Sequence, residues 1–176
     1  MRPEPDPAHG VVTAADVRDA ILHVRERMLD EGLAESLEAI NNGLCGDLAD
    51  DVVALLVERK SLSWTTFRDV SSMSVAEFIQ VDPDTGFSHD SGGPFDRSLL
   101  ARHWPGVRPP EGLDWDDLDA LSADAGFCAG THVFLCHEGL FYDAEAPDGV
   151  PSFFDLPFFK RVAASWLEER ATGNKP

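Results

Sequence analysis

The fold is decided most clearly by the stretch Asn41-Asn42-Gly43-Leu44-Cys45-Gly46-Asp47-Leu48-Ala49, in which turn residues give way to an apolar helix. Asn and Gly are typical of turns because they adopt backbone conformations that other residues avoid. Beyond this turn, apolar residues recur at helical spacing as far as Leu56, which predicts a helix from about Cys45 to Arg59. Cys45 would then open the helix, where the N-terminal end stabilises a thiolate.

Two further helices are predicted upstream of this stretch. Thr13 is placed to cap the first helix, with Asp16 as the acid of a capping box. Apolar residues then follow at helical spacing to Met28, and Gly32 ends the pattern. A shorter second helix is predicted from about Ala34 to Ile40, leading directly into the turn.

A β-hairpin is predicted over residues 131–145. Apolar and β-branched residues form two matching runs around a two-residue turn at 138–139. Such a turn places His132 opposite Glu145, with Asp143 on the diagonal, so that a carboxylate can reach the imidazole. A three-residue loop would instead turn the acids to the other face of the sheet.

The remaining segments carry weaker signals. A long irregular middle rich in Asp, Gly, Ser and Pro is expected to form a lid or one wall of a cleft. The other predicted elements are strands at 62–70 and 75–80, loops at 82–97 and 105–114, a helix at 116–125 capped by Asp114, and a final helix from Phe158 to Arg170.

Length and composition indicate one α+β domain. The chain has 176 residues, 43% of them hydrophobic, which is enough to build a core. We expect an extended tail at 1–12, a single domain at 13–172 and a tail at 173–176. The chain has neither a run of roughly 20 apolar residues nor the apolar core of a signal peptide at its start, so we expect a cytoplasmic location and no membrane contact.

Charge narrows the range of partners. There are 32 Asp and Glu residues against 14 Lys and Arg, a net charge of -18. Because this charge repels phosphates and anionic membranes, we expect no nucleic-acid partner. The three cysteines are an odd number and do not suggest a disulfide framework.

Cys45, His132 and a carboxylate are the residue types of a thiol acyl-transfer site. A thiolate is the nucleophile, and an imidazole takes the thiol proton and later gives it to the leaving group. A carboxylate on the other ring nitrogen fixes the orientation of the imidazole. Asp143 and Glu145 are both candidates for this third position.

Two features close to Cys45 act on its reactivity in opposite directions. A side-chain amide from Asn41 or Asn42, together with N–H groups at the helix start, would hold an oxyanion. In contrast, nearby carboxylates would raise the pKa of the thiol unless they point outward; these are Asp47, Asp50 and Asp51.

Three short motifs resemble the transglutaminase-like branch of papain-fold proteins. Gly43-Leu44-Cys45-Gly46-Asp47-Leu48-Ala49 resembles the nucleophile motif, Thr131-His132-Val133-Phe134 the histidine strand, and Leu140-Phe141-Tyr142-Asp143 the aspartate strand. The resemblance implies a papain-like or transglutaminase-like α+β fold, with N-terminal helices and the cysteine helix packed on a small antiparallel sheet.

The same resemblance implies cysteine-dependent acyl transfer on a peptide or protein amide. A Cys-His-Asp triad would act through a thioester, with peptide hydrolysis, deamidation or amide transfer as the outcome and with no cofactor. The family's Asp is often followed directly by Pro, whereas Asp143-Ala144-Glu145 departs from that pattern. The motif therefore favours Asp143 as the third member, and the hairpin register favours Glu145.

Two other classes of function remain open from the sequence. Cys128, His132 and Cys136 are four residues apart, as in a metal site on a helix, but they fall around a predicted strand and no Cys-x-x-Cys pair accompanies them. The other alternative is a non-catalytic acidic binding module of the same fold, such as a viral or anti-host factor.

Overall fold

The computed structural model describes residues 11–61, 71–74, 98, 101, 105–118 and 132–172. Four helices, three strands and one short 3-10 helix are the named elements of these residues. In chain order they are α1 (Ala14–Asp30), α2 (Leu37–Gly43), α3 (Cys45–Lys60), β1 (Ser71–Ser74), β2 (Val133–His137), β3 (Leu140–Tyr142), η1 (Phe153–Asp155) and α7 (Pro157–Thr172). Helices combined with an antiparallel sheet confirm the predicted α+β class.

The sheet has three antiparallel strands in the order β1-β2-β3. β2 and β3 form the predicted hairpin, with Leu135 opposite Tyr142 and His137 opposite Leu140. The two turn residues have positive φ, 49° at Glu138 and 77° at Gly139, as a type I′ turn requires. The predicted two-residue turn is therefore confirmed.

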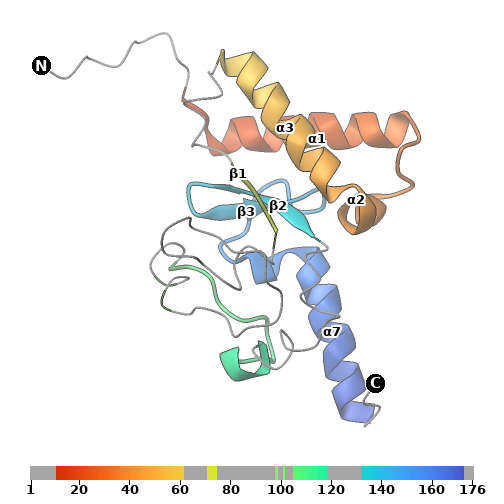
Figure 1. Ribbon diagram of the computed structural model, residues 1–176, viewed down its shortest axis with the longest axis vertical. Coiled ribbons are helices and arrows are strands. Elements are labelled where there is room, and N and C mark those ends of the chain that lie inside the picture. The colour runs from red at the N-terminus through yellow and green to blue at the C-terminus, as the bar shows by residue number, and fades with distance from the viewer. Residues whose placement is uncertain are drawn as a thin grey trace, which may run out of the picture.

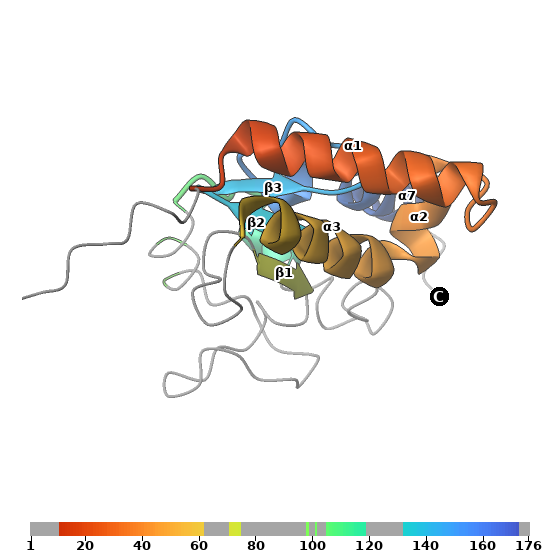
Figure 2. The same ribbon diagram turned by 90° about the horizontal axis from the view of Figure 1, so that it is seen from above.

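Helices cover both faces of this sheet, as Figure 1 shows with α1 and α3 on one side of the strands and α7 on the other. Successive strand residues point to opposite faces. Leu135 and Tyr142 pack with the apolar residues of α1 and α3. Phe134 and Phe141 pack with Phe153 and other aromatic residues of η1 and α7. Figure 2 shows α1 and α3 running along the sheet beside β3 and β1.

The start of α1 follows the predicted capping box. The N–H of Thr13 donates to the carboxylate of Asp16 over 2.8 Å, and the N–H of Asp16 donates to the Thr13 hydroxyl over 3.3 Å. Lys60 at the end of α3 lies 2.7 Å from the same carboxylate, and its hydrogen bond is the main reason why the pKa of Asp16 is lowered to about 2. Val12, which the sequence placed in the tail, is buried in the core.

The second helix differs from its predicted bounds. Ser36 caps it by accepting the N–H of Ala39 over 3.1 Å, so α2 starts later than expected and continues to Gly43. The residues predicted as a turn, 41–43, form its last turn. One residue, Leu44 with φ −121° and ψ 16°, separates α2 from α3, and Cys45 opens α3 as predicted.

The other predictions fare unevenly. The strands predicted at 62–70 and 75–80 and the loop predicted at 82–97 lie outside the described residues. β1 occupies Ser71–Ser74, between the two segments that were predicted as strands. Asp114 accepts the N–H groups of Asp116 and Asp117, each over 2.9 Å, as expected of a cap. The final helix is confirmed as α7.

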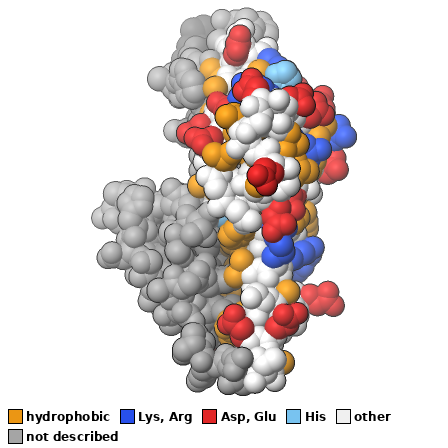
Figure 3. All heavy atoms as spheres, turned by 90° about the vertical axis from the view of Figure 1, so that its right-hand side faces the viewer, with side chains coloured by type: hydrophobic (Ala, Val, Ile, Leu, Met, Phe, Trp, Pro, Cys, Tyr) orange, Lys and Arg blue, Asp and Glu red, His pale blue; other side chains and the backbone are white. Residues whose placement is uncertain are grey.

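The surface mixes charge types, and the face in Figure 3 carries acidic side chains along most of its length. Within the described part of the chain, no helix is both long and apolar enough to cross a bilayer.

The loop after β3 depends on a glycine. Gly149 has φ +77°, and a Cβ there would lie 2.6 Å from Cε1 of the buried Tyr142 ring. We expect Gly149→Ala to lower the free energy of unfolding by about 2–4 kcal/mol, through backbone strain and overpacking together. Urea unfolding measures this loss.

Gly139→Ala is the matched control. Gly139 has the same φ of +77°, but nothing lies within 4 Å of a Cβ built there, so this variant should lose only about 1 kcal/mol. Equal losses in the two variants would contradict the packing argument.

Candidate active site

Cys45 lies where the cysteine helix meets the sheet. It is the first residue of α3 and is 7% exposed. The backbone N–H of Val133, the first residue of β2, donates to its sulfur over 3.3 Å. The thiol is thereby fixed beside the first residue of the strand that the candidate base directly precedes.

His132 directly precedes β2, and its side chain is fully buried. Nε2 lies 3.1 Å from Oδ2 of Asp143, and Nδ1 lies 3.1 Å from the backbone carbonyl of Asn41. A carboxylate and a carbonyl only accept hydrogen bonds, so this arrangement places a proton on each ring nitrogen. This geometry therefore favours the charged form of His132.

The electrostatics of Cys45 and His132 agree with that assignment. Burial alone would raise the pKa of the Cys45 thiol, but hydrogen bonds from His132 and Val133 and the charge of His132 bring it below its ordinary value of 9.0. Burial alone would lower the pKa of His132, but hydrogen bonds and charge interactions with Asp143 and Cys45 bring it above 6.5. Together the two shifts favour a thiolate–imidazolium pair.

Asp143 is positioned by its own backbone turn. One carboxylate oxygen accepts the N–H groups of Glu145 and Ala146, over 2.9 and 2.8 Å, and the other faces His132. Such Asx turns compete with strand pairing, and β3 ends at Tyr142. The ladder keeps the predicted register up to Leu135 and Tyr142 but does not extend to Glu145. The imidazole meets Asp143, the neighbour predicted on the diagonal, and not Glu145.

Glu145 points to a different set of partners. Its carboxylate accepts the side-chain amide of Asn41 over 2.8 Å. Arg161 on α7 donates to both of its oxygens, over 2.9 and 2.7 Å. Glu145 thus connects α2 with α7 next to the site.

The two candidate oxyanion donors also occupy other places. Asn41 is fully buried; its amide nitrogen donates to Glu145, and its amide oxygen accepts the N–H of Ala144 over 3.2 Å. Asn42 is exposed on the last turn of α2. This geometry does not support a side-chain oxyanion role for either residue, and it leaves the N–H groups at the start of α3 as the candidate donors.

The aspartates that follow Cys45 satisfy the condition set by the sequence. Asp47 and Asp50 are exposed, and Asp51 is half-buried and paired with Arg27 of α1. The thiol is buried whereas these side chains face solvent or Arg27, so its lowered pKa is compatible with their presence.

The metal alternative gains no support in the part of the chain that the structure describes. No group of three or more His, Cys, Asp or Glu side chains there is arranged to hold a metal ion. Cys136 lies half-buried on β2, and Cys128 falls outside the described residues.

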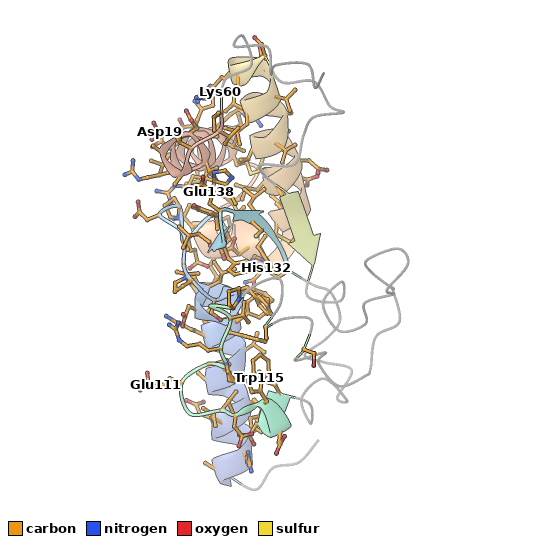
Figure 4. The ribbon with its side chains drawn as sticks, turned by 90° about the vertical axis from the view of Figure 1, so that its left-hand side faces the viewer. Asp19, Lys60, Glu111, Trp115, His132 and Glu138 are labelled. Carbon is orange, nitrogen blue, oxygen red and sulfur yellow. The ribbon has the colours of Figure 1, made fainter. Side chains whose placement is uncertain are left out.

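Two residues of α7 belong to the site but were not predicted from the sequence. The ring of Phe158 stacks on His132, with centroids 4.3 Å apart and planes at 21°, and Arg161 holds Glu145. Figure 4 shows His132 between the sheet and the first turns of α7. Neither residue falls in a motif, and only their spacing of three on one helix face could have linked them.

Comparisons of this chain with models of protein families, with curated proteins and with solved structures gave no match.

Proposed function

We propose that the protein is a cysteine-dependent enzyme that transfers the acyl group of a peptide or protein amide. The observation that carries this proposal is the line of contacts from Asp143 through the buried His132 to the Cys45 thiol, whose pKa is lowered by hydrogen bonding to His132. A thiolate paired with an imidazolium is the activated form of such a nucleophile.

The arrangement of the elements supports a papain-like or transglutaminase-like organisation. The cysteine opens a helix that packs on an antiparallel sheet, the histidine directly precedes one strand, and the aspartate directly follows the next strand. The order and the secondary-structure context of all three residues match the motifs that the sequence resembles.

In the proposed reaction the thiolate of Cys45 attacks the amide carbonyl carbon, and the carbonyl electrons move to oxygen. Collapse of this oxyanion breaks the C–N bond, and His132 gives its proton to the departing nitrogen. A thioester on Cys45 and a neutral His132 remain.

In the second step the thioester is resolved. His132 takes a proton from a water molecule or an amine as that molecule attacks the thioester carbon. The C–S bond then breaks, and its electrons return to the sulfur of Cys45 as the thiolate. Water gives hydrolysis or deamidation, and an amine gives transfer. Asp143 holds the ring in one orientation and stabilises its charged form throughout.

A non-catalytic acidic binding module is the second candidate, and burial favours it. His132 is fully buried and Cys45 is only 7% exposed, so a substrate can reach these two residues only if the side chains around them move. An amide-derived electrophile such as a peptide vinyl sulfone separates the two candidates, because an enzyme labels at Cys45 and a binding module does not.

Thiol reactivity provides the direct test of the proposal. At pH 7 we expect iodoacetamide to alkylate Cys45 about 10-fold or more faster than Cys136, because each pKa unit changes the thiolate fraction tenfold. Peptide mapping by mass spectrometry after timed quenching gives each rate. Cys45→Ser is the control, since it should leave the rates at Cys128 and Cys136 unchanged. Equal, slow alkylation of all three thiols would sink the proposal.

A further inference from the structure

Asn41 is a buried residue that contacts the site through three polar groups. Its backbone carbonyl accepts from His132, its amide oxygen accepts the N–H of Ala144, and its amide nitrogen donates to Glu145. Any rotation of Asn41 would therefore move the imidazole and the loop after Asp143 together.

Glu145, which accepts the side-chain amide of Asn41, also forms an ion pair with Arg161 of α7. The guanidinium meets the carboxylate through two parallel hydrogen bonds, a geometry that fixes direction as well as distance. Arg161 also lies 3.6 Å from Glu38 in the first turn of α2. One side chain of α7 thereby holds both the partner of Asn41 and the helix that carries Asn41.

α7 also contacts the imidazole of His132 directly. Phe158 lies three residues before Arg161, on the same face of the helix, and its ring stacks on His132. The loop is also tied to α1, since Arg25 donates to the carbonyl of Ala144 over 2.8 Å. The ion pair is thus the charged connection between α7 and the loop that carries Asp143.

We propose that Arg161 is a positioning residue that acts through Glu145 and Asn41 to hold the imidazole of His132 in place between Cys45 and Asp143. This inference rests on the proposed function. It gives Glu145, a candidate for the triad on sequence grounds, a supporting role outside the triad.

The test compares the pH profile of Cys45 alkylation by iodoacetamide in Arg161→Met and in wild type. We expect the midpoint to rise by about one pH unit, and the rate below the midpoint to fall about tenfold, because the displaced imidazole no longer stabilises the thiolate. Arg161→Lys keeps the charge but not the paired hydrogen bonds, so it should fall between the two.

Arg170→Met is the matched control. Arg170 is on the same helix and pairs with Asp117 away from the site, so its loss should lower stability without moving the pH profile. Glu145→Gln combined with Arg161→Met should shift the midpoint no further than Arg161→Met alone, because the two residues act in one path. Glu145→Gln also replaces Arg161→Met if that variant does not fold.

The possible results distinguish a failure of the positioning role from a failure of the proposed function. If wild-type Cys45 reacts selectively and the profiles of Arg161→Met and Glu145→Gln match that of Arg170→Met, the positioning role is overturned and the proposed function stands. If wild-type Cys45 shows no selectivity over Cys136, the proposed function itself fails.

Discussion

Replacing His132 with alanine is expected to raise the pKa of the Cys45 thiol. Burial raises this pKa and remains in the variant, whereas the side-chain hydrogen bond and the charge of His132 that lower it are lost, and only the backbone hydrogen bonds of Val133 and Gly46 still lower it. The selective alkylation of Cys45 at pH 7 should disappear. Acyl transfer from a peptide amide should fall by about 10²–10⁴-fold, because the general acid and base are lost. The alkylation midpoint and the turnover rate are the two measurements.

His137→Ala is the control for this result. His137 is also a buried histidine of the same hairpin, at the opposite end of β2 and 4% exposed. Its loss should affect stability but not the pH profile of Cys45. The rate at Cys136 reports unfolding, since an unfolded chain exposes all of its thiols alike. A similar shift in both histidine variants would contradict the assignment of His132 as the base.

Asp143→Asn is expected to separate catalysis from folding. The amide oxygen can still accept the N–H groups of Glu145 and Ala146, but its NH₂ group then faces Nε2 of His132 and forces that nitrogen to become an acceptor. Acyl transfer should fall roughly 10²–10⁴-fold because the imidazole is held in the wrong protonation state. Steady-state turnover of a peptide amide measures the loss.

Asp143→Ala is the comparison that isolates stability. It removes both oxygens and leaves Nε2 of the charged imidazole without its acceptor, so we expect a loss of about 3–5 kcal/mol in the free energy of unfolding. Chemical denaturation should therefore rank Asp143→Asn well above Asp143→Ala, with turnover low in both. If Asp143→Asn retains full turnover, Asp143 is not the third member of the triad.

Local signals in the sequence predicted the parts of this structure that depend on neighbouring residues. The capping box of Thr13 and Asp16 and the two-residue turn of the hairpin each lie within a few residues, and so does the helix start at Cys45. Such features are determined by residues that are close together in the sequence. They were sufficient to place a thiol, an imidazole and an acid on adjoining elements.

The predictions that failed depended on competition between signals. Ser36 caps α2 later than the apolar pattern suggested, so Asn41 lies in a helix and not in a turn. The hairpin ladder ends at Tyr142 because Asp143 binds the N–H groups that follow it. The contact of Arg161 with Glu145 joins residues 16 positions apart, and no local pattern distinguishes it from an ordinary surface ion pair.

The single-residue break at Leu44 has a further consequence for Cys45 and His132. Asn41, in the last turn of α2, offers a carbonyl to the imidazolium, and Cys45 stands at the first position of α3. The negative pole of one helix therefore faces the cation and the positive pole of the next faces the anion, each contributing about 0.3–1 kcal/mol. One continuous helix would have no poles at this point. By interrupting it, the chain builds a local electric field that already favours charge separation before any substrate arrives.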